Sequence, residues 1–245
     1  MFTDHPITSP PPPETKIWRY MSLEAYIDLL VSSSLHMSQL ARMEDPWEGL
    51  YGEGNVPYRR ERFGKDYEWL DKQKFFEAFS NDARKTNYVS WHASPYESAA
   101  MWDVYAANGK GVAVRARWDR LTAALKSESL IYGSKVSYID HATTAIPEDN
   151  GMYPVICKRL SYEHEREVRL IGHPSFEPYM ETPETPLDYE RLPPFFKVPF
   201  DLTTAVDEAL VAPRAQSWVQ AVVEDVTRKY GFDWPVTQSP LLRPL

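Results

Sequence analysis

Hydrophobic and polar positions follow two different periods along the chain, and their order predicts both strands and helices. Residues 17–20, IWRY, form a short apolar and aromatic stretch typical of a strand. Ser22 follows as a candidate N-cap, and apolar residues then recur at the spacing of one helix face. These helical positions are Leu23, Tyr26, Ile27, Leu30 and Val31. The pattern therefore predicts a strand followed directly by an amphipathic helix.

Further elements are predicted where short apolar runs are bounded by turn residues. Strands are expected over residues 35–39, 88–92, 111–117, 135–140 and 206–213. Helices are expected around residues 68–79, from a capping box at Ser94–Glu97 through Tyr105, over residues 120–127, and from Trp218 to Gly231. Because strands and helices mix without strict βαβ alternation, the pattern favours an α+β fold. We expect one domain with a central mixed or antiparallel sheet flanked by helices.

The stretch CKRLSYEHEREVRLIG, residues 157–172, joins a charge run to an apolar end. If it is one strand, Glu163, Glu165, Glu167 and Arg169 share a face, because alternate residues point to the same side. The start of such a strand is expected at the end of a sheet, and its apolar end in the core. Two interpretations stay open: a solvated edge strand with Glu–Arg pairs, or a strand that carries carboxylates into a site.

The ends of the chain and one internal segment show little periodicity. Residues 1–15 are proline-rich and polar, so a flexible tail is expected there. Residues 16–235 are expected to form the single domain, and residues 236–245 a C-terminal tail. Residues 173–195 are again rich in proline and predict a long surface excursion.

Composition narrows the classes of function. The net charge of −8 gives no footprint for non-specific nucleic-acid binding, although a local basic groove stays possible. Cys157 is the one cysteine, which excludes an internal disulfide framework and indicates a reducing compartment. No signal peptide is recognisable, and no apolar run approaches the roughly 18 residues of a membrane span. A cytoplasmic protein is therefore expected. The six histidines show no metal-ligand spacing, so no metal site is expected.

Arg19 and the glutamates carry the main candidate chemistry. The guanidinium of Arg19 suits a pyrophosphate or a carboxylate ligand. The alternative is a structural salt bridge to Asp45, to Glu48 or to the glutamate pair. Ser90 would share a strand face with His92, but no third partner or nucleophile elbow accompanies them, so a nucleophile pair is not favoured.

Four blocks, in order, resemble one bacterial family, DUF 2971, a domain of unknown function. They are IWRYMSLEAYIDLL, MEDPWEG, YVSWHASPYESAAMWDVYAANGKGVAVR and CKRLSYEHEREVRL, and they span about residues 16–172. VDEALVAP and the last predicted helix are similar to the tail of that family. Trp47 stands where the family usually has Phe, and Val168 where an aromatic is common; both are interpreted as core substitutions. The family name implies no established chemistry.

The layout also resembles the ADP-ribosyltransferase fold, which includes bacterial toxins that modify nucleic acid. Such proteins carry an Arg or His on the first strand, small hydroxyl residues on a second, and a catalytic Glu on a late strand, often in a Glu-x-Glu pair. The resemblance implies NAD as cofactor, with Glu167 catalytic and Glu165 assisting it. The residues that it implies for cofactor binding are Arg19, Tyr20, Ser90, Trp102 and Tyr105.

The resemblance implies ADP-ribosyl transfer or NAD hydrolysis, with a toxin or antiphage effector that acts on a protein or nucleic acid as the expected role. The residue types themselves favour packing in the core for Tyr20, Trp102 and Tyr105 over contact with a cofactor. Two rival functions stay open: a non-catalytic module that binds a ligand or protein, and a Mg²⁺-dependent hydrolase or nuclease that uses the same carboxylates. The sequence leaves the acceptor and the oligomeric state open.

Overall fold

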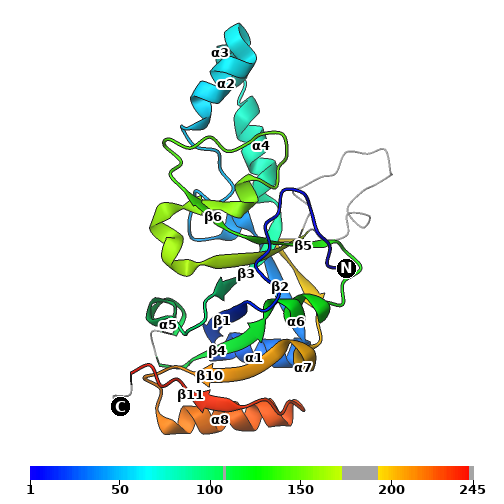
Figure 1. Ribbon diagram of the computed structural model, residues 1–245, viewed down its shortest axis with the longest axis vertical. Coiled ribbons are helices and arrows are strands. Elements are labelled where there is room, and N and C mark those ends of the chain that lie inside the picture. Colours follow the sequence, from blue (N-terminus) through cyan, green and yellow to red (C-terminus); the bar gives the residue numbers. More distant parts are fainter. Residues whose placement is uncertain (107–108, 173–192, 243–245) are drawn as a thin grey trace.

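The computed structural model describes residues 1–106, 109–172 and 193–242, and a central sheet organises them (Figure 1). Along the sheet the strands follow the order β11–β10–β4–β1–β3–β2–β9, and β8 and β5 join it beside β3. The pairs are antiparallel except β10 and β11, which run parallel. The expected α+β fold with a central mixed sheet is confirmed.

The strands of this sheet are short. They are β1 Lys16–Ser22, β2 Ser34–Gln39, β3 Asn87–Ala93, β4 Gly111–Arg117, β5 Ile131–Lys135, β8 Glu167–Gly172, β9 Phe195–Pro199, β10 Val206–Val211 and β11 Val236–Gln238. Two further strands, β6 Ser137–Ile139 and β7 Cys157–Arg159, form a separate parallel pair. The strand expected over residues 135–140 is therefore divided between the last residue of β5 and the whole of β6.

Helices lie at both ends of the molecule and along the sheet (Figure 1). The α-helices are α1 Leu23–Ser32, α2 Asn55–Phe63, α3 Tyr67–Lys72, α4 Phe75–Arg84, α5 Ala99–Ala106, α6 Trp118–Ala123, α7 Leu202–Ala205 and α8 Ser217–Lys229. The 3₁₀ helices are η1 Leu40–Arg42, η2 Gly64–Asp66, η3 Pro154–Ile156 and η4 Leu160–Glu165. In Figure 1, α2, α3 and α4 project at the top, and α8 lies at the opposite end. The helix expected around residues 68–79 is interrupted at Lys74, whose φ is 56°.

The first helix forms as the sequence predicts. The Ser22 side chain accepts a hydrogen bond from the backbone N–H of Ala25, so the predicted N-cap is confirmed. The helix buries Tyr26, Leu29 and Leu30. These residues join the largest hydrophobic cluster, which also includes β1, β4 and α8.

The first 15 residues do not form a loose tail. The N–H of Thr3 donates to the carbonyl of Ile131, and the N–H of Lys135 donates to the carbonyl of Ser9, both at 2.9 Å. Phe2 packs edge-on against Trp118 at a ring distance of 6.0 Å. The physical reason is that β5 pairs with β8 on one edge only, so the N-terminal residues cover the other edge.

The expected C-terminal tail also begins too early, because β11 lies within residues 236–245 and extends the sheet beside β10. The capping box at residues 94–97 does not form, since α5 begins later, at Ala99. The carboxylate of Glu97 accepts hydrogen bonds from Trp102 Nε1 and from the Ser239 hydroxyl instead. Of the predicted surface excursion, residues 173–192 lie outside the described part of the chain.

The stretch 157–172 is not one strand. Its first three residues form β7, the next six form η4, and β8 begins only after Arg166, which adopts a left-handed φ of 42°. Glu163 and Glu165 therefore do not share a strand face with Glu167. Every residue of β8 is buried, and β8 pairs with both β3 and β5. The interpretation as a solvated edge strand is wrong.

Candidate functional site

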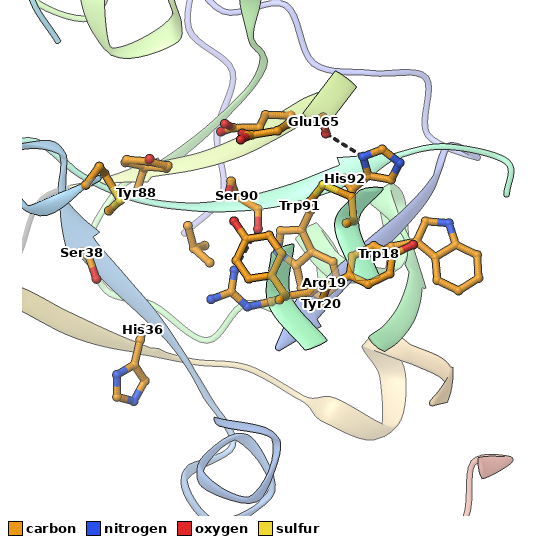
Figure 2. Close-up of a pocket in the computed structure, with 15 residues that line it drawn as sticks. Trp18, Arg19, Tyr20, His36, Ser38, Tyr88, Ser90, Trp91, His92 and Glu165 are labelled. Carbon is orange, nitrogen blue, oxygen red and sulfur yellow. Dashed lines mark hydrogen bonds between the residues drawn. The ribbon is translucent and has the colours of Figure 1, made fainter. Parts of the chain in front are cut away.

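The central sheet divides at β3. One edge of β3 pairs with β8 from Asn87 to His92. On the other edge, the first two residues of β3 pair with β2, and the last two pair with β1. Between these contacts β1 and β2 separate, and a cleft of about 250 Å³ opens at the fork (Figure 2).

Arg19 of β1 lies in this fork. Its Nη1 donates to the backbone carbonyl of Ser90, at 2.8 Å. Among the residues that the structure describes, no carboxylate forms an ion pair with Arg19. Burial lowers the pKa of Arg19, yet a guanidinium remains charged at physiological pH. The fork therefore contains a cation that can still take an anionic ligand.

The salt bridges proposed for Arg19 from the sequence are absent because other cations occupy those carboxylates. Asp45 pairs with Arg159, whose Nη2 lies 2.7 Å from Oδ1. Glu48 pairs with Lys158 at 3.2 Å and with Arg169 at 2.8 Å. The alternative of a structural Arg19 ion pair with Asp45 or Glu48 is therefore wrong.

A buried ionic cluster forms another wall of the cleft. Nζ of Lys158 lies 2.5 Å from Glu165 Oε2 and 2.5 Å from Glu167 Oε1. Arg169 donates from Nε to Glu167 and from Nη2 to Glu48, at 2.8 Å each. Three carboxylates thus face two cations, so the cluster carries one net negative charge when all five groups are ionised.

The two glutamates of the predicted pair respond differently to this surplus. Burial, and then the hydrogen bond with Glu167, raise the pKa of Glu165 to about 7, although Lys158 opposes the shift. Burial also acts to raise the pKa of Glu167, but Arg169, Glu165 and Lys158 outweigh it and lower that pKa below its usual value. Glu167 therefore stays ionised, while Glu165 exchanges a proton near neutral pH.

Access to the cleft also differs between Glu165 and Glu167. Both carboxylate oxygens of Glu167 are held, and its side chain is 5% exposed. Glu165 keeps one oxygen outside the contact with Lys158, and its side chain is 14% exposed. Both residues line the cleft. Glu165 is the carboxyl group better placed to reach a ligand, and Glu167 the one that anchors the cluster.

Aromatic side chains line the space between Arg19 and the glutamates. Tyr105, at the end of α5, is partly exposed, and burial raises the pKa of its phenol. The charges of Glu165 and Glu167 raise that pKa further, while those of Lys158 and Arg19 lower it. The phenol of Tyr105 therefore interacts electrostatically with both Arg19 and the ionic cluster.

Of the five residues predicted to bind a cofactor, Arg19, Tyr20, Ser90 and Tyr105 line the cleft, and Trp102 does not. Trp102 is buried behind Tyr20, with the two rings edge-on at 5.0 Å. The Tyr20 hydroxyl accepts a hydrogen bond from the N–H of Ser98 at 2.8 Å. Trp102 therefore supports the wall of the cleft from behind.

Sequence reasoning considered His92 only as a neighbour of Ser90 and did not assign Lys158 to the site. Nδ1 of His92 lies 2.6 Å from the backbone carbonyl of Glu165, and it must carry the proton to donate to that oxygen (Figure 2). The contact depends on the left-handed turn at Arg166, which no local pattern signals. Lys158 belongs to β7, outside the main sheet, so strand periodicity could not connect it with Glu167.

A second hollow, of about 310 Å³, adjoins the cleft. Arg19 and His36 line both, so they mark the boundary between the two. Asp28 of α1 lies on the far side, and its carboxylate is 2.8 Å from His36 Nε2 and 3.3 Å from Lys197 Nζ. Arg19 therefore lines two hollows, one that contains Glu165 and one that contains Asp28.

Two classes of feature are not found in the described part of the chain. No group of three or more His, Cys, Asp or Glu side chains is arranged to hold a metal ion. No helix there has the length and apolar character needed to cross a membrane.

Comparisons with known proteins add little to this geometry. No family model matches the chain, so the resemblance to DUF 2971 stays a prediction. No curated protein matches either. Among solved structures, the chain is similar to DarT from Thermus sp. 2.9, solved in complex with ADP-ribosylated ssDNA. The alignment covers 95% of this chain and 97% of that chain, with 9% identity and a TM-score of 0.40, a likeness too distant to carry an argument.

Proposed function

We propose that the forked cleft binds NAD and that the protein cleaves the bond between nicotinamide and ribose, as an ADP-ribosyltransferase or NAD glycohydrolase. One observation carries the proposal. Arg19 has no acidic partner among the described residues, and it lies between two adjoining hollows, one of which contains Glu165.

The shape of the space favours a ligand with an anionic centre and two lobes. Arginine binds pyrophosphate oxygens through two parallel N–H donors, and the NAD pyrophosphate joins two nucleosides. The two hollows, of about 250 and 310 Å³, are near the lower end of the usual range for ligand sites. A dinucleotide would fill both, with its phosphates at Arg19.

The ionic cluster supports placing the nicotinamide riboside on the glutamate side. When the glycosidic bond breaks, its electron pair moves to the pyridine nitrogen, and nicotinamide leaves as a neutral molecule. The ribose carbon then carries developing positive charge, which the surplus negative charge of the cluster would stabilise. Tyr105 and Tyr88 would flank the leaving ring, and Ser90 would lie beside the ribose.

Water or an acceptor then adds to the ribose carbon and loses a proton. Glu165 is suited to receive that proton, because a carboxyl with a pKa of about 7 is partly ionised at neutral pH and can hold a proton afterwards. Glu167 would keep Lys158 and Arg169 in place and contribute negative charge. In this assignment both predicted catalytic glutamates contribute, with Glu165 in the proton-transfer role.

The test uses purified protein and NAD labelled in the nicotinamide ring or in the adenine. Wild type is expected to bind NAD and release nicotinamide. Arg19→Gln should weaken NAD binding by about tenfold or more, as expected for lost charge-assisted hydrogen bonds. Glu165→Gln should lower turnover and leave binding nearly unchanged.

A matched control is Arg117→Gln, because Arg117 lies on β4, is 45% exposed and pairs with Asp119. This variant should behave as wild type. If wild type neither binds NAD nor releases nicotinamide, the proposal fails. Binding that survives both Glu165→Gln and Glu167→Gln, without turnover in wild type, would support the non-catalytic module instead.

The adenine label separates the two activities. Transfer of that label to a protein or nucleic acid in a bacterial lysate would identify a transferase and would be consistent with a toxin or antiphage effector. Nicotinamide release without transfer would restrict the activity to NAD hydrolysis. Loss of activity with a chelator would favour the Mg²⁺-dependent alternative.

A further inference from the structure

A separate hollow of about 390 Å³ lies beyond the η4 segment from the candidate site. Leu160 and Ser161, at the start of η4, line this hollow, whereas Glu165, at its end, lines the forked cleft. The proposed function makes no use of this hollow. Its walls combine an exposed indole, two carboxylates and a buried imidazole.

Trp47 provides the aromatic wall. It is 40% exposed, so the core substitution expected at this position is wrong. The Arg159 guanidinium lies 6.0 Å from the centre of its ring, at the outer limit of a cation–π contact. Arg159 itself is neutralised by Asp45, at 2.7 Å. The hollow therefore gains no surplus positive charge from Arg159.

Glu53 and Asp140 supply negative charge. Both are exposed and line the hollow, and neither belongs to an ion pair within the described residues. The carboxylate of Asp140 accepts hydrogen bonds from the N–H of Ala142 and the hydroxyl of Thr143. These donors are neutral, so they give the carboxylate no counter-charge. The hollow thus favours a cation and repels phosphate.

His141 adds a buried imidazole, whose ring lies edge-on to Trp47 at 6.2 Å. It is 7% exposed and lines the hollow, and its buried Nδ1 has no hydrogen-bond partner of normal geometry within the described part of the chain. Burial lowers its pKa, although Asp45 opposes the shift, so the ring is neutral at pH 7. A neutral imidazole keeps one nitrogen that accepts a hydrogen bond.

We propose that this hollow docks an arginine side chain of a partner protein. A guanidinium is planar, stacks on an indole face and offers five N–H donors. Trp47 would provide the stacking surface, Glu53 and Asp140 the counter-charge, and His141 the remaining acceptor. The site does not depend on the proposed NAD activity, so either proposal can fail without the other.

The test uses the full chain and the peptide acetyl-Gly-Arg-Gly amide, with acetyl-Gly-citrulline-Gly amide as the neutral control of the same shape. Binding is followed by the indole N–H signals in a nitrogen–proton NMR spectrum, where Trp47→Phe assigns the relevant signal. The arginine peptide should shift the Trp47 signal with millimolar affinity, and the citrulline peptide should not.

Variants show whether these residues form the site. Glu53→Gln and Asp140→Asn should each weaken binding by about two- to fivefold, the range for an exposed ion pair. Trp69→Ala, on the projecting α3, removes another exposed indole and should leave binding unchanged. The dispersed NMR spectrum of each variant verifies that it folds.

Three results would overturn the proposal. The first is an unmoved Trp47 signal with the arginine peptide, or an equal shift with citrulline. The second is a stronger response to uridine monophosphate, which would indicate a nucleotide. The third is tighter binding of free argininamide than of the peptide, which would exclude a protein segment as the natural occupant.

Discussion

Replacing Lys158 by methionine would remove the cation at the centre of three buried carboxylates and keep a chain of similar length. Nζ lies 2.5 Å from oxygens of Glu165 and Glu167 and 3.2 Å from Glu48, and the side chain is 6% exposed. In the variant, Arg169 would be the one cation of this cluster still facing the three glutamates. The protein would then bury two carboxylate charges in excess.

The expected cost follows from these contacts. A hydrogen bond to a charged group contributes about 1.5–3 kcal/mol to the free energy of unfolding. If the two bonds from Lys158 were additive, their loss would cost more free energy than most single mutations do. The desolvation of the lysine also disappears, and that offsets part of the loss. Removal of one partner from a buried ion pair typically costs about 3–5 kcal/mol, and we expect this loss at pH 8.

The loss should shrink as the pH falls. The pKa of Glu165 is raised to about 7 in the folded wild type. Protonation of Glu165 therefore stabilises the fold in full below the pKa that this residue has in the unfolded chain. This stabilisation is lost as pH rises through 7. Without Lys158 this pKa would rise further, and protonation would relieve the cluster at a higher pH. The gap between variant and wild type should therefore narrow from pH 8 towards pH 5.5.

Urea unfolding followed by tryptophan fluorescence measures the difference. Lys126→Met is the matched control, because Nζ of Lys126 is 3.7 Å from Asp201 and its side chain is 66% exposed. That change should alter the free energy of unfolding by less than about 1 kcal/mol. The reasoning is refuted if Lys158→Met costs no more than this control, or if its cost is independent of pH.

Three further expectations concern the pH profile, the N-terminus and one close contact. Nicotinamide release should increase with pH through about 7, because the ionised form of Glu165 accepts the proton, and Glu165→Gln should flatten this profile. A wild-type profile that falls over this range would contradict the assignment. Deleting residues 1–9 should uncover the free edge of β5, which lowers the midpoint of thermal unfolding and promotes association measured by light scattering. An unchanged midpoint would indicate that this segment adds no stability. Gly133→Ala should destabilise the fold by about 1–3 kcal/mol in urea unfolding, because the new Cβ would lie 2.4 Å from the Trp118 ring. Gly151→Ala should cost far less, because its Cβ would have no atom within 4 Å.

Local patterns predicted the elements that depend on local interactions. The strand Gly111–Arg117 has the predicted bounds, and Ser22 caps the first helix, since apolar spacing and a cap hydrogen bond act within a few residues. The capping box at Ser94 failed because Trp102 and Ser239 compete for the Glu97 carboxylate. A partner 142 residues away cannot be read from a four-residue motif.

The same distinction holds for the site. The sequence singled out Arg19, Ser90 and the glutamate pair, because their residue types suit the proposed chemistry. It could not predict that Asp45 and Glu48, the expected partners of Arg19, would form ion pairs with Arg159 and Arg169 instead. It also placed Glu165 on a strand, because a left-handed arginine such as Arg166 is uncommon for a residue with a side chain. Competition between distant charges decided these contacts.

The fork of the sheet has a consequence for how a ligand can be found. Its walls come from strands β1, β2 and β3 and from the η4–β8 segment, which are far apart along the chain and meet only when the sheet is complete. A molecule that fits the fork binds only the folded protein, so at a hundred times its dissociation constant it would add about 2.7 kcal/mol to the free energy of unfolding. A melting-temperature screen of nucleotides would therefore identify the occupant of the fork without any assumption about the reaction it undergoes.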